Sequence, residues 1–184
     1  MIHIYKIRAD VNRYQWLMPE NEDGILELLT FDCVTKKEHW KTDMYIHNPK
    51  KECGNFFSLG GIGALAFDEI VLDKMLTIFE MAGEILPIRA DGKNLYALNV
   101  MECTNALDQK NSKWEYFADG TKGRIISYSF HKNRFIESSL FKIPETSKAD
   151  VLTYSGLKDK DDEFYSLYLK YGFTGLIFEE LFTF

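Results

Sequence analysis

One stretch in the middle of the chain restricts the possible folds more than any other, because a helical pattern there stops abruptly and gives way to a hairpin pattern. Across residues 69–82 a polar side chain recurs every three or four positions, and mostly apolar side chains fill the rest. This is the period of an α-helix with a narrow polar face, so the helix should pack against other elements on more than one side. Asp68 precedes it and suits the N-cap, because its carboxylate can accept the free N–H groups of the first turn.

The same pattern makes two detailed predictions for this helix. Leu72, Leu76 and Phe79 lie off the polar stripe, so we expect all three side chains to be almost fully buried. Gly83 follows the last periodic residue, at the position where a left-handed glycine commonly ends a helix.

A β-hairpin is predicted directly after the helix. Two strand-like runs, residues 85–89 and 95–101, flank the dipeptide Asp91-Gly92. This dipeptide readily takes the positive φ angles of a two-residue turn. Pro87 has no N–H to donate, which places its strand at an edge or a bulge.

Further strands and one more helix are predicted on both sides of this segment. Strand-like runs occur near residues 2–7, 14–17, 40–46, 139–143, 151–154 and 176–178, and residues 64–67 are a brief apolar entry to the helix. Residues 25–31 have an ambiguous period and favour a strand. A second helix is expected over residues 157–171, ended by Gly172, with the charged residues 158–163 facing solvent. Residues 48–63 and 105–123 are expected to be long loops.

Residues 124–131 alternate in polarity and predict a half-buried antiparallel strand, with Ile126, Tyr128 and Phe130 on one face.

Hairpin-like strands with only two clear helices favour an α+β fold over a doubly wound sheet. The sequence therefore predicts an α+β protein with an antiparallel or mixed β-sheet, two principal helices and long loops. Its 184 residues favour a single domain spanning 1–184.

Charge and cysteine content restrict the partners. The formal net charge of −6 opposes nucleic-acid binding, which needs a basic face, and is compatible with a basic protein partner, although ordinary solubility explains it equally well. The three cysteines, Cys33, Cys53 and Cys103, form no C-x-x-C pair and predict reduced thiols in a cytoplasmic protein. The first residues do not resemble a signal peptide, and no apolar run approaches the ~18 residues of a membrane span.

No motif predicts catalysis, a cofactor or a metal. The glycine-rich residues 58–63 lack the order of a dinucleotide or P-loop motif, and a flexible loop or close packing is the simpler interpretation. His39, His47 and Cys53, with Cys33 upstream, match no zinc spacing. The acidic residues 159–163 are interleaved with lysines at a helix start, which is typical of a solvated face.

Aromatic side chains in or beside polar segments are the candidate partner-binding residues. Trp40, Trp114, Tyr116 and Phe117 occupy such positions, and tryptophan and tyrosine commonly dominate binding energy when a partner buries them. The alternative is that Trp114 and its neighbours fold back as a small cluster beneath their own loop. Asp159 and Asp161 are expected at the rim of the contact, where charge speeds encounter more than it adds affinity.

Within residues 64–180, the order of several segments resembles that of an immunity-protein family of bacterial polymorphic toxin systems. The segments are Phe67-Asp68 with the following helix to Gly83, Glu84-Ile85-Leu86-Pro87-Ile88, Tyr96-Ala97-Leu98-Asn99-Val100, Leu107-Asp108, Leu140-Phe141-Lys142-Ile143, Val151-Leu152-Thr153-Tyr154-Ser155 and Tyr171-Gly172-Phe173-Thr174-Gly175-Leu176-Ile177-Phe178. The resemblance covers residues 64–180, whereas residues 1–63 form a variable N-terminal part.

The resemblance implies an α+β cytoplasmic protein that neutralises a cognate bacterial toxin by direct stoichiometric binding, with no catalytic residues to assign. Two other classes of function stay open: a small enzyme whose residues converge only in the fold, and a general protein-interaction module. The toxin, the binding face and the oligomeric state are not predicted.

Overall fold

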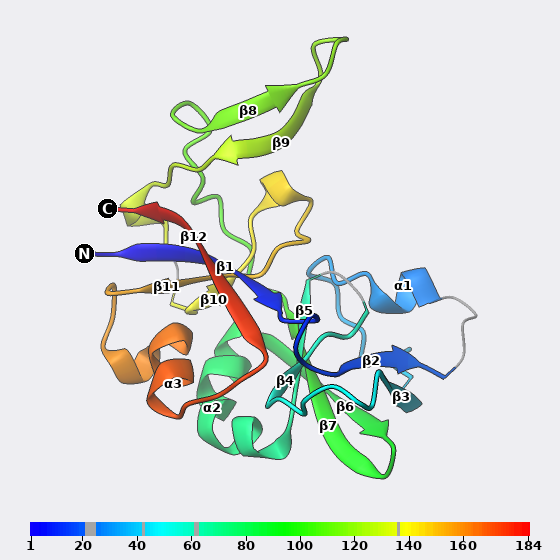
Figure 1. Ribbon diagram of the computed structural model, residues 1–184. Coiled ribbons are helices and arrows are strands. Elements are labelled where there is room, and N and C mark those ends of the chain that lie inside the picture. Colours follow the sequence, from blue (N-terminus) through cyan, green and yellow to red (C-terminus); the bar gives the residue numbers. More distant parts are fainter. Residues whose placement is uncertain (21–24, 42, 61–62, 136) are drawn as a thin grey trace.

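The computed structural model describes residues 1–20, 25–41, 43–60, 63–135 and 137–184. Within these ranges the strands form a six-stranded sheet, a four-stranded sheet and a separate two-stranded hairpin, with three α-helices (Figure 1). The sheets are antiparallel or mixed, which confirms the predicted α+β class. None of the helices in these ranges combines the length and the apolar character that crossing a membrane requires.

The six-stranded sheet contains the predicted hairpin. Its strand order is β2 (Trp16–Pro19), β3 (Asp43–His47), β6 (Gly83–Ala90), β7 (Lys93–Val100), β5 (Ala64–Phe67) and β4 (Phe56–Phe57). Only the β3–β6 pair is parallel. The turn between β6 and β7 has positive φ at Asp91 (49°) and Gly92 (76°), as that dipeptide predicts.

The four-stranded sheet joins the two ends of the chain. Its order is β10 (Leu140–Phe141), β11 (Leu152–Ser155), β1 (His3–Ala9) and β12 (Leu176–Thr183), all antiparallel. His3 lies opposite Thr183, so the termini are side by side (Figure 1). Strand β1 is thus paired on both sides by strands from the last third of the chain.

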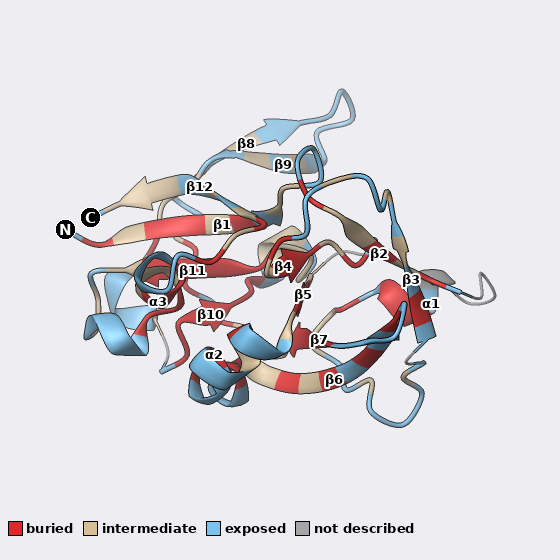
Figure 2. Ribbon diagram, turned by 60° about the horizontal axis from the view of Figure 1, so that its bottom comes forward, coloured by how far each residue is buried: buried red, intermediate tan, exposed pale blue. Residues whose placement is uncertain are grey.

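Two helices cover the core between these sheets. Helix α2 (Glu69–Ala82) begins at Asp68, whose carboxylate accepts the Val71 N–H at 2.9 Å, as predicted. Helix α3 (Phe164–Lys170) packs against β11 and touches α2. Its following Gly172 has positive φ and ends it, as expected. The largest buried cluster combines side chains of both helices with residues of both sheets; in Figure 2 β1 and β10 are largely red, whereas much of α2 and α3 is pale blue.

The predicted burial on α2 is right for one side chain and wrong for the other two. Phe79 is fully buried, but Leu76 is 43 % exposed and Leu72 is only half-buried. Residues two positions apart on a helix differ by about 200°, so Leu76 lies nearly opposite the buried Ile78. Helix α2 is therefore covered mainly on one side, and the prediction of packing on more than one side was wrong.

Gly83 ends α2 for a different reason from the one predicted. Its backbone is extended (φ 168°, ψ −139°) and it is already the first residue of β6. A Cβ at this position would collide with the backbone oxygen of Asn99 on the neighbouring strand. Close approach of two backbones, and not left-handed geometry, requires the glycine.

Pro87 lies at a local sheet edge, as its missing N–H predicts. Among the described residues, β3 pairs with β6 at Arg89 and Ala90, and no described strand lies beside β6 on that side at Pro87. There the Trp40 indole N–H donates to the Pro87 carbonyl at 2.7 Å.

Residues 25–29 form the short helix α1 (Ile25–Leu29), so the predicted strand over residues 25–31 was wrong. Leu28 and Leu29 are adjacent in sequence and both buried, whereas a strand would send them to opposite faces. A run this short fits either period, which is why the pattern misled. Of the expected loop over residues 48–63, Phe56 and Phe57 form strand β4, and residues 61–62 lie outside the described ranges.

The second predicted helix is shorter than expected. It starts at Phe164, after the 3-10 turn η3 (Lys160–Asp162); the other 3-10 turns are η1 (Lys132–Arg134) and η2 (Pro144–Thr146). Glu163 was expected in solvent but is only 1 % exposed. Its carboxylate accepts hydrogen bonds from the backbone N–H groups of Leu157 and Lys158 and from the Ser166 hydroxyl. These donors replace water around the buried charge.

Candidate protein-binding interface

A two-stranded hairpin projects from the body of the protein. Strands β8 (Lys113–Tyr116) and β9 (Lys122–Ser127) pair only with each other, and we call residues 113–127 the arm (Figure 1). The sequence predicted a loop up to residue 123, which was wrong for β8. The alternation Lys113-Trp114-Glu115-Tyr116 carried the strand signal, but its polar neighbours concealed it.

The projecting part of the arm exposes large apolar side chains. Tyr116, Phe117 and Ile126 are 58 %, 61 % and 63 % exposed, and most of the arm is pale blue in Figure 2. The predicted common face of Ile126, Tyr128 and Phe130 was wrong, because β9 ends at Ser127 and only Phe130 of the three is buried. Each of these three side chains therefore has apolar surface that a partner protein can cover.

Trp114 has a different role from its neighbours on the arm. Its half-buried ring packs against a core cluster of the body, and Lys122 Nζ lies 4.6 Å from the ring centroid. The indole N–H is buried and meets no acceptor among the described residues. Trp114 therefore attaches the arm to the body, whereas Tyr116 and Phe117 stay exposed, so these residues do not form the separate cluster beneath their own loop that the alternative predicted.

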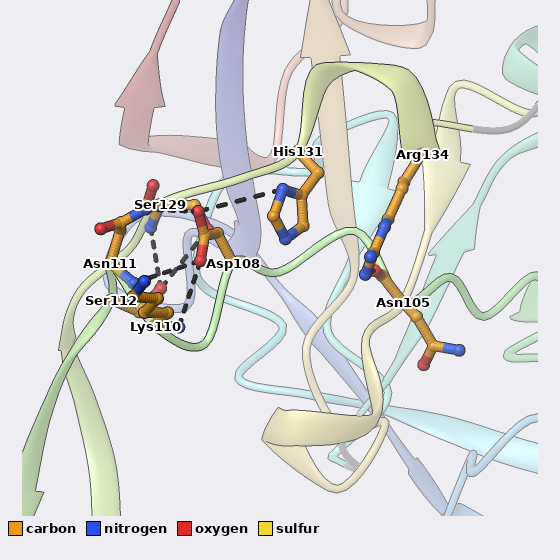
Figure 3. Close-up of polar contacts among 8 residues, drawn as sticks. All are labelled: Asn105, Asp108, Lys110, Asn111, Ser112, Ser129, His131 and Arg134. Carbon is orange, nitrogen blue, oxygen red and sulfur yellow. Dashed lines mark hydrogen bonds and ion pairs between the residues drawn. The ribbon is translucent and has the colours of Figure 1, made fainter.

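The Asp108 carboxylate holds the chain that leads into β8, at the base of the arm (Figure 3). Asp108 accepts hydrogen bonds from the backbone N–H groups of Lys110 and Asn111 and, at 2.7 Å, from the Asn111 side-chain amide. The Asn111 amide makes the largest contribution to holding the pKa of Asp108 below its usual value, and His131, whose Nδ1 lies 3.9 Å away, adds to it.

Hydrogen bonds also join the chain before β8 to the chain after β9 at the base of the arm (Figure 3). Asp108 N donates to the Ser129 carbonyl at 2.8 Å, and Ser129 N donates to the Ser112 hydroxyl at 3.0 Å. Below them, Arg134 donates to the Asn105 carbonyl at 3.1 Å. The arm is thus fixed at its base and free of the body along the part that carries Tyr116 and Phe117.

The arm differs in charge from the protein as a whole. Its cations are Lys113, Lys122 and Arg124, and its carboxylates are Glu115 and Asp119. The arm is therefore slightly basic, although the chain carries −6. The earlier expectation of a basic partner, drawn from total charge, does not extend to this surface, which suits an apolar patch bordered by carboxylates.

The other predicted contact residues lie elsewhere. Trp40 is half-buried against Phe31, its N–H bonded to Pro87, so packing and hydrogen bonding account for it within the fold. Asp159 and Asp161 lie at the start of the α3 region, at the other end of the molecule from the arm (Figure 1), and Asp161 accepts from Lys170 at 2.6 Å. The structure does not bring these three places together.

A cleft of about 540 Å³ lies between the arm and the sheet of β1 and β12. Its cations are matched by carboxylates: Lys6 with Asp150 at 2.7 Å and Arg8 with Glu179 at 3.0 Å. Burial raises the pKa of Tyr128, which also lines the cleft, to about 12. These groups hold one another and none is a nucleophile paired with a base. Across the described ranges, no three His, Cys, Asp or Glu side chains are grouped closely enough to hold a metal ion.

Comparison with known proteins adds no relative: no protein-family model matches the chain, and no curated protein matches it significantly.

Proposed function

We propose that the protein is an immunity protein that neutralises a cognate bacterial toxin by direct, stoichiometric binding, and that the arm is its principal contact. The observation that carries this proposal is the exposed group of Tyr116, Phe117 and Ile126 on a hairpin that projects from the body. The resemblance of residues 64–180 to an immunity-protein family supplies the kind of partner.

The physical form of the arm supports a binding role. Exposing three large apolar side chains on one small hairpin to water costs free energy, and the isolated protein gains no stability in return. A partner that buries them recovers part of it, and aromatic residues are frequent energetic centres of such contacts. The hydrogen-bonded base at Asp108 and Ser129 reduces the ordering cost, because the hairpin is already formed.

The arm can also enter a concave surface. A two-stranded ribbon that projects from a globular body reaches places that a flat face does not. Insertion into the active-site cleft of a toxin would exclude its substrate without any chemistry by the inhibitor. This mechanism needs no catalytic residue in the immunity protein.

The test uses a toxin encoded next to the gene for this protein. Co-expression measures protection, and titration of the purified toxin's activity measures stoichiometry. We expect complete inhibition at about one equivalent. The variant Tyr116→Ser/Phe117→Ser should stay folded and lose protection, with a complex lifetime shortened by two orders of magnitude or more, as expected for hot-spot residues.

A matched control separates the arm from general surface hydrophobicity. Ile70 on α2 is 61 % exposed, and α2 lies at the opposite end of the molecule from the arm (Figure 1). Ile70→Ser should bind and protect like the parent protein. If the folded arm variant protects equally well, the arm is not the contact. If the parent protects at amounts far below those of the toxin, the protein acts as an enzyme and the proposal fails.

A further inference from the structure

Chain segments far apart in sequence meet around the buried amino group of Lys142. Lys142 is 0 % exposed, and its Nζ donates to the Phe31 carbonyl at 2.5 Å. Its own backbone N–H donates to the Glu102 carbonyl at 2.8 Å, and its carbonyl accepts the Thr104 N–H at 2.9 Å. Gly63 covers the amine, since a Cβ there would come within 2.8 Å of Nζ.

This arrangement places two free cysteines together. Cys33 follows Phe31 by two residues, and Cys103 forms a β-bridge with Lys142. The two thiols lie close enough together that Cys33 contributes to raising the pKa of the Cys103 thiol. Both side chains are partly exposed, so a small reagent can reach them. Cys53, the third cysteine, is exposed, and Lys93 Nζ lies 4.0 Å from its sulfur.

The backbone on the Cys33 side is fixed by buried polar groups. The Asn99 side-chain amide donates to the Val34 carbonyl at 2.8 Å, and the Glu84 carboxylate accepts the Lys36 N–H at 2.6 Å. Cys33 itself has a φ of 70°, which is uncommon for a residue with a side chain and persists only where surrounding contacts hold it. The Cys103 side is fixed by the bonds to the Lys142 backbone. Fixed backbones on both sides preorganise the pair.

We propose that Cys33 and Cys103 are a reversible thiol–disulfide pair, oxidised by small-molecule disulfides and reduced by thiols. This inference does not depend on the proposed function.

The exchange proceeds in two balanced steps. The Cys33 thiolate attacks one sulfur of the reagent, whose S–S bond breaks to give a Cys33 mixed disulfide and one reagent thiolate, which takes up the Cys33 proton. Cys103 then attacks the Cys33 sulfur, and the second reagent thiol leaves with the Cys103 proton. Two protein thiols are oxidised to one disulfide, and one reagent disulfide is reduced to two thiols.

The surroundings determine which sulfur reacts first. Burial, together with the neighbouring Cys33, raises the pKa of Cys103 to about 11, so Cys103 stays protonated at neutral pH. Burial lowers the pKa of Lys142 to about 8, but Lys142 is still largely protonated at pH 7. Because Cys103 stays protonated, Cys33 is the attacking sulfur, and Lys142, which bonds to the Phe31 carbonyl and to the backbone on both sides of Cys103, is a positioning residue.

The cross-link would join the segment after α1 to the chain that leads into the arm. Cys103 precedes Asn105 and Asp108 at the base of the arm, so oxidation would anchor that base directly to residues 31–36. Closing so long a loop should raise the melting temperature, because it restricts the unfolded chain.

The experiment incubates the full chain with oxidised glutathione at pH 7.5, then measures intact mass and maps disulfide-linked peptides. We expect a loss of mass equal to two hydrogen atoms, a Cys33–Cys103 peptide, and reversal by reduced glutathione. The melting temperature should rise in the oxidised form. Cys53→Ser is the matched control, and it should give the same linkage and the same mass change.

Single variants test the order of the steps. Cys103→Ser should accumulate glutathione on Cys33, while Cys33→Ser should react much more slowly at Cys103. Lys142→Met, if folded, should slow formation of the Cys33–Cys103 linkage more than formation of the Cys33 adduct, because Lys142 positions the two segments; if it does not fold, the measurements on the parent and Cys53→Ser still decide. Unresolved glutathione adducts on the parent protein, a linkage through Cys53, or no reaction would each overturn the proposal.

Discussion

Helix α2 and the arm both carry apolar side chains, but the most important of these differ in their contact with water. On α2, Phe79 and Ile78 are buried in the cluster formed by both sheets and α3. On the arm, Tyr116 and Phe117 are mostly exposed. The contrast shows that composition and period identify elements, whereas burial depends on which other elements reach them. Phe79 and Ile78 stabilise the fold, whereas Tyr116 and Phe117 are available to a partner.

The largest expected difference lies within α2 itself. Phe79→Ala should lower the free energy of unfolding by about 3–5 kcal/mol, because it removes a fully buried ring and leaves a cavity. Leu76→Ala on the exposed side should cost about 0.5 kcal/mol or less. Urea denaturation of the two variants measures both values. Similar losses would mean that Leu76 is covered in solution, for example by a second molecule.

The next effect concerns a buried carboxylate beside the six-stranded sheet. Burial alone would raise the pKa of Glu84, but hydrogen bonds from the Asn99 amide, the Lys36 N–H and the Thr35 hydroxyl outweigh it, so the pKa is lowered. A carboxylate with a lowered pKa stabilises the fold above its unfolded pKa, near 4.5, and the benefit disappears as pH falls through the folded pKa. Glu84→Gln should therefore cost roughly 1–3 kcal/mol at pH 7.

Denaturation at several pH values checks this dependence. The difference in stability between the parent and Glu84→Gln should shrink steadily as pH falls below about 4.5. Asp73→Asn, at an exposed position on α2, is a control that should show a small difference throughout. A gap for Glu84→Gln that is the same at pH 3 and pH 7 would contradict the role of its charge.

A smaller, local effect is expected at the base of the arm. Asp108→Ala removes the acceptor for two backbone N–H groups and the Asn111 amide. Amide hydrogen exchange within residues 113–127 should become faster, while exchange in α2 stays unchanged. The parent should show the same local loosening in acid, because protonation of Asp108 weakens these hydrogen bonds. Equal acceleration in both regions would show that the arm does not open independently.

The smallest effect on stability is expected where we propose the largest effect on binding. Tyr116→Ser/Phe117→Ser should change the free energy of unfolding by no more than about 0.5 kcal/mol, since both rings are exposed. Thermal or urea denaturation measures it. A loss of several kcal/mol would show that these rings pack on the body, and the comparison between arm and helix would fail.

Much of the fold was predictable from local chemistry. The cap at Asp68, the turn at Asp91-Gly92 and the free edge at Pro87 each follow from one residue's hydrogen-bonding or φ preference, and the structure confirms all three. Residues 25–31 were misassigned because a short apolar run fits two periods. The exposure of Leu76 depends on where α3 and β10 end, which no local pattern encodes.

The candidate interface was predictable only in part. Aromatic residues in polar surroundings predict a contact with a partner. Tyr116 and Phe117 have such surroundings, and both are exposed. Trp114 was chosen by the same argument, yet it packs on the body, since its contacts come from segments distant in sequence. The spacing of the cysteines does not predict that Cys33 and Cys103 lie together, for the same reason. They are 70 positions apart in the sequence, and Lys142 is a further segment of the chain, C-terminal to both.

The position of β1 between β11 and β12 also governs how the protein can be made. The ribosome synthesises β1 first, but the strands on either side of it come from residues 152–155 and 176–183. Strand β1 therefore stays unpaired until residues 152–155, and then residues 176–183, have been synthesised. A nascent chain can form α2 and the β6–β7 hairpin before the four-stranded sheet is complete. Until then the apolar side chains of β1 are exposed to aggregation or to chaperones.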